Sequence, residues 1–109
     1  MSDTLDLLEK QYFTIKSNFN QLIASCQTDE QRTALQNAYA TARDNYNTAV
    51  NSVLSDNDPT VTALRTELQT KQQQIENSLA NLQNIATIVD TITNGVAVGT
   101  KLVGILGGA

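Results

Sequence analysis

The sequence predicts an all-α protein, a long antiparallel helical hairpin packed like a coiled coil, and three observations support this. First, no glycine occurs before residue 95 and the chain holds a single proline, which is what long helices require. Second, apolar residues recur at helical spacing through both halves of the chain. Third, the one strong helix breaker, at Pro59, divides the chain into nearly equal arms. A three-helix bundle with a reversal near Thr28 is the alternative.

The first arm, residues 1–55, begins with an amphipathic helix. Its apolar residues alternate steps of three and four: Leu5, Leu8, Tyr12, Ile15, Phe19, Leu22 and Cys26. Polar residues, Gln11 among them, fill the other face, which we expect to meet solvent. Cys26 continues the apolar stripe, so we expect a buried thiol. As the single cysteine, it excludes an intramolecular disulfide.

The apolar stripe is interrupted at residues 27–31. It resumes one residue out of phase at Leu35, Tyr39, Ala42, Tyr46, Ala49 and Val53. Thr28, followed three residues later by Gln31, matches a capping box, the pattern of a helix start. Either one helix continues through a kink, or a second helix begins here. Because no glycine or proline is present to make a sharp reversal, we expect continuation.

Residues 56–59 form the predicted turn between the arms. Asp58 is suited to cap a helix, and Pro59 to occupy its first position. Asp56 and Glu67 have the spacing of a calcium loop, but Val61 stands where that loop requires glycine. No metal site is therefore predicted. Each arm would be roughly 75 Å long at the helical rise of 1.5 Å per residue.

The second arm, residues 60–94, and the segment after it carry a heptad pattern. Every seventh residue is aliphatic: Val61, Leu68, Ile75, Leu82, Val89, Val96 and Val103. This pattern predicts one unbroken helix from Val61 to Leu106. Its outer face is polar through about residue 84, with Gln72 on it. From Ile85 onward the polar face becomes narrower, so this part of the helix needs apolar neighbours on a second side as well.

Residues 95–109 form an apolar, glycine-rich segment that we expect to be the main assembly surface. Gly95 with Gly99, and Gly104 with Gly108, have the four-residue spacing that lets another helix backbone approach closely. The predicted interface residues are Val89, Ile92, Gly95, Val96, Gly99, Leu102, Val103, Gly104, Leu106 and Gly108. Replacing Gly99 with Leu is expected to block assembly and leave the arms helical.

A stable single-pass membrane anchor is disfavoured. The stretch 91–109 barely reaches the hydrocarbon thickness, at about 28 Å as a helix. Lys101 lies inside it and would cost on the order of 3 kcal/mol at the centre of a bilayer. An oligomer that pairs Lys101 inward remains open.

Composition excludes several classes of function for what we expect to be a single domain, 1–109. The chain has no histidine, so Ser/His and Cys/His pairs are impossible, and we expect neither an enzyme nor a cofactor or small-molecule substrate. A formal charge of −4 without a basic cluster disfavours nucleic acid. Asn, Gln and Thr make up about a third of the chain, an unusual share. In this broad composition it resembles secreted self-assembling helical proteins such as flagellins and secretion needles.

Three hypotheses about function follow. The first is a non-enzymatic, self-associating helical hairpin that forms an oligomer or filament through its apolar C-terminal helix. The second is a small membrane-active protein that inserts this segment, as helical pore formers do. The third is an adaptor whose tail docks on one protein partner. The contact, with lipid or protein, would involve residues 85–109. No cleavable leader is predicted, because residues 1–10 are acidic and amphipathic, which leaves a cytoplasmic location, membrane association and leaderless export open.

Overall fold

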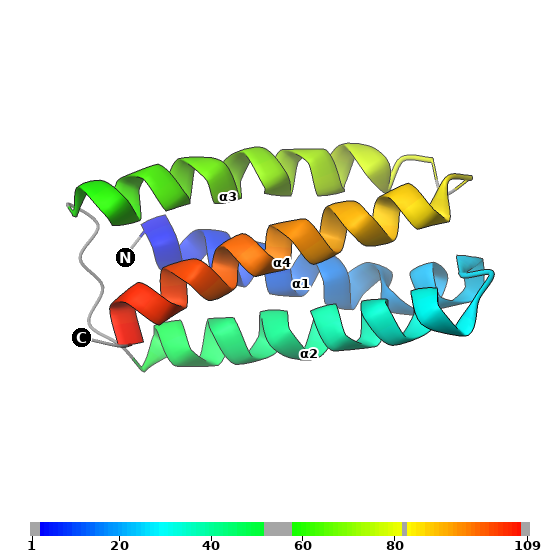
Figure 1. Cartoon of the computed structure of the whole chain (residues 1–109), viewed down its shortest axis with the longest axis horizontal. Coiled ribbons are helices and arrows are strands. Elements are labelled where there is room, and N and C mark those ends of the chain that lie inside the picture. Colours follow the sequence, from blue (N-terminus) through cyan, green and yellow to red (C-terminus); the bar gives the residue numbers. More distant parts are fainter. Residues whose placement is uncertain (1–2, 52–57, 82, 108–109) are drawn as a thin grey trace.

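The computed structural model describes residues 3–51, 58–81 and 83–107, and the regular structure within them is entirely helical. The predicted all-α class is confirmed. The helices are α1 (Asp3–Ser25), α2 (Asp29–Val50), α3 (Pro59–Ser78) and α4 (Ile85–Gly107). They alternate in direction along one long axis (Figure 1), and the extents of the bundle are 41 × 21 × 19 Å.

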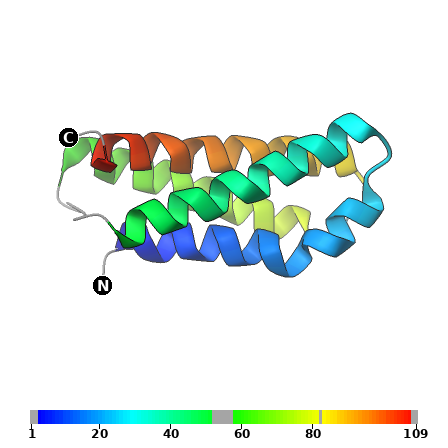
Figure 2. The same cartoon turned by 90° about the horizontal axis from the view of Figure 1, so that it is seen from below.

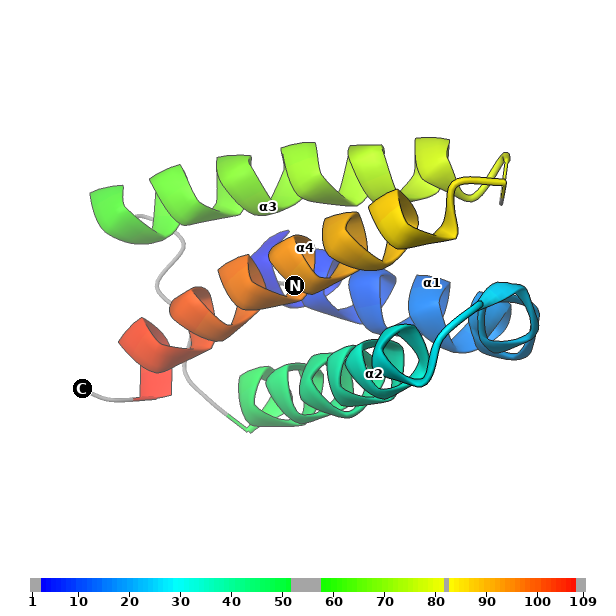
Figure 3. The same ribbon diagram turned by 45° about the vertical axis from the view of Figure 1, so that its right-hand side comes forward.

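The order of the helices around the bundle differs from their order in the chain. α4 packs against α2 and α3, and α1 packs against the same two helices, with a smaller α1–α4 contact across the centre. Among the described residues, α2 and α3 do not touch, although they are consecutive in the chain. Figure 3 shows α4 between α3 and α2. α2 and α4 are therefore parallel neighbours, and Figure 2 shows α2 lying across α1 and α4.

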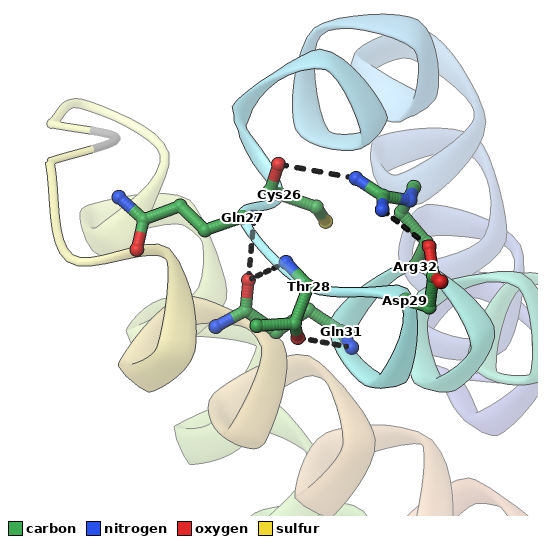
Figure 4. Close-up of polar contacts among 6 residues, drawn as sticks. All are labelled: Cys26, Gln27, Thr28, Asp29, Gln31 and Arg32. Atoms are coloured by element: carbon green, nitrogen blue, oxygen red, sulfur yellow. Dashed lines mark hydrogen bonds and ion pairs between the residues drawn. The ribbon is translucent and has the colours of Figure 1, made fainter.

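The first arm reverses where the sequence favoured continuation. α1 ends at Ser25 and α2 begins at Asp29. The capping box is present: Thr28 Oγ1 accepts the Gln31 backbone N–H at 3.1 Å. The Gln31 side-chain oxygen accepts the N–H groups of Gln27 at 2.7 Å and Thr28 at 3.3 Å (Figure 4).

The carbonyl end of α1 is satisfied at the same reversal. Arg32 Nη1 donates to the Cys26 carbonyl at 3.4 Å, and Arg32 also forms an ion pair with Asp29. The Cys26 N–H closes a tight last turn onto the Ile23 carbonyl at 3.2 Å. The expected continuous helix is thus wrong. Side-chain donors and acceptors supply what glycine supplies at other reversals, by pairing the free backbone groups of both helix ends.

The expected unbroken helix from Val61 to Leu106 is also wrong, because α3 ends at Ser78 and α4 starts at Ile85. The Asn81 backbone N–H bonds to the Ser78 carbonyl at 3.2 Å, which closes a short turn. The Asn81 side-chain oxygen then accepts the Gln83 N–H at 3.1 Å. The asparagine competes with the helix for backbone hydrogen bonds. Each predicted arm is consequently folded in half, so the break near residues 27–31 is present and the described helices form a four-helix bundle.

The heptad pattern nevertheless identified the buried faces of both helices. Val61, Leu68 and Ile75 of α3 and Val89 and Val96 of α4 are at most 4% exposed. Val103 is half-buried, and Leu82 lies outside the described residues. The heptad therefore marks the inner faces of two antiparallel helices, with Ile75, Val89 and Val96 in one core cluster and Val61 and Leu68 in a second.

The predicted start of α3 is confirmed. Asp58 Oδ1 accepts the backbone N–H groups of Thr60 at 2.8 Å and Val61 at 3.3 Å, and Pro59 occupies the first turn. Residues 56 and 57 of the predicted turn lie outside the described part of the chain.

Candidate interaction surface

Most of the predicted interface residues lie in the core of the chain itself. Val89, Ile92, Val96 and Leu102 are at most 4% exposed, and Gly95 and Gly99 are buried too. Val103 is half-buried and Gly104 is exposed. The side chain of Leu106, and Gly108 as a whole, fall outside what the structure describes. The helices α1, α2 and α3 provide the additional apolar neighbours that α4 needs.

The glycines of α4 serve this internal packing. A β-carbon on Gly95 would lie 2.9 Å from Ile75 Cδ1, and one on Gly99 would lie 3.1 Å from Leu8 Cδ2. A β-carbon on Gly104 would meet nothing within 4 Å. Close helix approach at Gly95 and Gly99 therefore occurs, but between helices of one chain.

A layer of amide side chains crosses the bundle beside these glycines. Asn45 is 5% exposed, and its Nδ2 donates to Thr100 Oγ1 at 3.2 Å and to the Val96 carbonyl at 3.5 Å. Gln72 is 2% exposed, and its Nε2 donates to Thr14 Oγ1 at 3.1 Å.

Gln11 completes this layer. It is 0% exposed, and neither its Nε2 nor its Oε1 has a hydrogen-bond partner among the described residues. The expectation that Gln11 and Gln72 face solvent is wrong, because a helix inside a bundle buries a wider face than a two-stranded contact does.

The solvent-exposed side of α4 adjoins a groove formed with α2. The residues lining its first hollow, of about 370 Å³, are Ala34, Asn37, Ala38, Thr41, Thr93, Val96, Ala97 and Thr100. A second hollow of about 340 Å³ shares Ala34 and continues toward the start of both helices, lined also by Thr28, Glu30, Gln31, Ala86, Val89 and Asp90. We call these two hollows together the α2/α4 groove. It is long, shallow and lined mainly by small side chains.

The aliphatic pattern did not predict this exposed side of α4, because the aliphatic residues mark the opposite face of the helix. The spacing of Ala86, Thr93, Ala97 and Gly104 on one helix face was visible in the sequence and could have identified it. The packing of the other helices decides which of the two faces of α4 meets solvent.

Charge is unevenly distributed along the groove. Glu30 and Asp90 line its hollow near the start of α2 and α4. Lys101, the one cation of α4, is exposed nearer the end of that helix. The ion pairs formed among the described residues are Lys10–Glu76, Arg32–Asp29 and Arg43–Asp44, so Asp90 and Lys101 take part in none of them.

The five aromatic residues of the chain gather in one cluster on α1 and α2. Tyr12 stacks between Tyr39 at 5.9 Å and Tyr46 at 5.8 Å, and Phe19 lies 4.7 Å from Tyr39. Burial raises the pKa of Tyr39 and of Tyr46, and the neighbouring Glu9 carboxylate raises that of Tyr46 further. Only Phe13 is largely exposed, at 43%. The cluster packs α1 against α2, and its rings are partly buried against the core.

The other hollows among the described residues are lined mainly by polar or charged side chains. A hollow of about 580 Å³ between α1 and α3 is wide open, and its Lys10 and Glu76 pair with each other at 3.4 Å. Within the described ranges no group of three His, Cys, Asp or Glu side chains could hold a metal ion. Residues 85–105 of α4 are long and apolar enough to cross a membrane, with mean hydropathy 1.2, and 44% of that window is buried in the bundle.

The α2/α4 groove is the best candidate for an interaction surface. No protein-family model, curated protein or solved structure matches the chain.

Proposed function

We propose that this chain is a non-enzymatic helical protein that associates with copies of itself through the α2/α4 groove. The observation that carries the proposal is the composition of the groove: Ala34, Ala38 and Ala97 with Thr41 and Thr93 are small side chains, over which a helix of another copy can approach α2 and α4 closely. Alanine loses no side-chain conformational entropy when it is buried, so the entropic cost of packing a helix against these residues is small. Small side chains also bring helix backbones close together.

Sedimentation of the whole chain tests this function. The parent protein should sediment at twice the mass of the chain or more, and its apparent mass should fall on dilution. Ala97→Arg places a long cation in the groove and should give monomer. Ala63→Arg is the matched control, because Ala63 is an exposed alanine on α3. A parent protein that is monomeric at millimolar concentration would contradict the proposal.

A second function, membrane insertion of α4, is supported by one specific observation. Residues 85–105 combine a mean hydropathy of 1.2 with a length that would span about 30 Å of hydrocarbon. Insertion would require α4 to leave the bundle, so the exposed Asp90 and Lys101 would each cost about 3 kcal/mol in the bilayer.

Dye release from liposomes tests the membrane function separately. Asn94→Arg adds a cation at an exposed position in the middle of α4 and should abolish release. Asn77→Arg makes the same change on α3, where Asn77 is also exposed, and should not affect it. Absence of release by the parent protein would exclude this function. A stable monomer that ignores liposomes would favour an adaptor that docks another protein.

A further inference from the structure

The exposed side of α4 has its own regular pattern. Six of its exposed residues follow alternating steps of four and three: Ala86, Asp90, Thr93, Ala97, Thr100 and Gly104. All of them are exposed, and this spacing keeps them on one face of the helix. We call this set the outer stripe of α4. Steps of four and three are the spacing of helix–helix contacts.

The outer stripe is nearly symmetric about Gly95. Three pairs are each equidistant from that residue in the sequence: Ala86 with Gly104, Asp90 with Thr100, and Thr93 with Ala97. If a second α4 lies antiparallel across the first near Gly95, each member faces its counterpart. Small residues then face small residues along most of the contact. A two-fold interface needs this kind of self-complementarity.

The two charged residues of α4 follow the same symmetry. Asp90 and Lys101 carry opposite charges and are both exposed. The midpoint between them in the sequence falls between Gly95 and Val96. Eleven residues separate them, which at about 100° per residue places them within roughly 20° around the helix axis. They therefore lie on the same flank of the outer stripe.

That flank decides the direction of the contact. In an antiparallel helix pair a given flank faces the same flank of the other helix, so Asp90 of each copy meets Lys101 of the other. In a parallel pair in register the two copies of this flank lie on opposite sides of the contact, so neither charge meets its opposite. Glu30 lies in the same hollow as Asp90 and adds negative charge where the second lysine arrives.

We propose that the partner in the groove is a second copy of this chain, docked as a two-fold antiparallel pair of α4 helices with Asp90 of each copy against Lys101 of the other. This inference rests on the proposed self-association and specifies its geometry. The outer stripe supplies the packing surface, and the two symmetric ion pairs set the register.

A charge-swap series on the full chain tests the geometry by sedimentation at low salt. Asp90→Lys alone and Lys101→Asp alone each place like charges opposite one another at both ends, and each should raise the dimer Kd roughly tenfold. The double variant Asp90→Lys with Lys101→Asp should restore the parent Kd. Salt at 1 M should remove most of the difference between the variants. Glu67→Lys, at an exposed site on α3, changes the net charge as Asp90→Lys does and should have little effect.

Cross-linking gives an independent measurement of direction. In a Cys26→Ala background, Ala86→Cys and Gly104→Cys chains should form a disulfide-linked dimer when mixed, and neither should do so alone. A failure of the antiparallel geometry and a failure of self-association give different results. A dimeric parent whose single charge variants match it, or whose double variant is not restored, overturns the antiparallel pairing and leaves self-association standing. A monomeric parent overturns both.

Discussion

Gln11 of α1 lies against Gly99 of α4, so that a β-carbon on Gly99 would come within 3.1 Å of Gln11 Oε1. Because Gly99 has no side chain, α1 and α4, which lie diagonally opposite each other in the bundle, can approach closely. The same approach encloses the Gln11 amide, which is 0% exposed, and within the described part of the chain neither of its polar atoms has a hydrogen-bond partner. An unpaired amide in an apolar surround costs free energy. The centre of the bundle is thus tightly packed and also destabilised by a polar group.

Gln11→Met should stabilise the protein. Methionine has a similar length and no unpaired donor or acceptor, so the free energy of unfolding should rise by about 1–2 kcal/mol. Urea unfolding followed by circular dichroism measures this. Gln69→Met, at an exposed glutamine of α3, is the control and should be near neutral. A loss of stability in Gln11→Met would mean that the amide is hydrogen-bonded in solution.

Gly99→Leu should disrupt the fold itself, whereas the sequence analysis expected it to block assembly and spare the helices. The new side chain would overlap Gln11, Leu8 and Asn45, each of which lies 3.1–3.2 Å from the position of a β-carbon. Overpacking of this kind costs about 1–3 kcal/mol or more. Gly104→Ala is the contrasting change, because its β-carbon meets nothing within 4 Å. It should raise stability by up to about 1 kcal/mol through helix propensity. Equal thermal midpoints for the two variants would contradict this packing.

Asn45→Ala should loosen the contact between α2 and α4. The change removes the hydrogen bonds from Nδ2 to Thr100 Oγ1 and to the Val96 carbonyl, and it should lower the free energy of unfolding by about 1–2 kcal/mol. Hydrogen exchange of α4 amides should speed up in parallel. Asn47→Ala serves as the control, since Asn47 is exposed on the same helix. If both variants unfold alike, Asn45 does not join the two helices.

Thr28→Ala should destabilise the reversal between α1 and α2. It removes the N-cap acceptor of α2, which bonds to the Gln31 N–H at 3.1 Å. Loss of such a cap costs about 0.5–2 kcal/mol. Thr33→Ala, at an exposed position within α2, removes a hydroxyl without removing a cap and should not destabilise. Urea midpoints that rank the two variants the other way would argue against the cap.

The Cys26 thiol should make stability depend on alkaline pH. Burial raises the pKa of Cys26, against an opposing effect of Arg32, and the thiol donates to the Leu22 carbonyl at 3.3 Å. Because the folded-state pKa lies above the unfolded value of about 8.5, the stabilisation is present below that pH. It is lost as pH rises through the folded pKa. Unfolding free energies at pH 7 and pH 10 should therefore converge between parent and Cys26→Ala as pH rises. A constant difference across that range would contradict the shift.

The sequence was informative about those structural features that are decided by residues close together in the chain. Asp58 with Pro59, and Thr28 with Gln31, are local capping signals that act within one turn of backbone. The first predicted the start of α3 correctly, whereas the second was visible as a capping box although a continuous helix was expected. The heptad from Val61 to Val103 likewise identified the buried faces, because apolar periodicity is a property of each helix alone.

What the sequence by itself determined about this protein is its helical class, the start of α3 and which aliphatic residues are buried. Only the tertiary structure decided that the chain reverses at 26–28 and 79–84, that Gln11 and Gln72 turn inward, and that the glycines Gly95 and Gly99 meet helices of the same chain. The physical reason is that helix ends and burial depend on which surfaces compete for contact, and those surfaces come from residues far apart in the chain. Periodicity identifies a face of a helix, whereas packing selects what covers it.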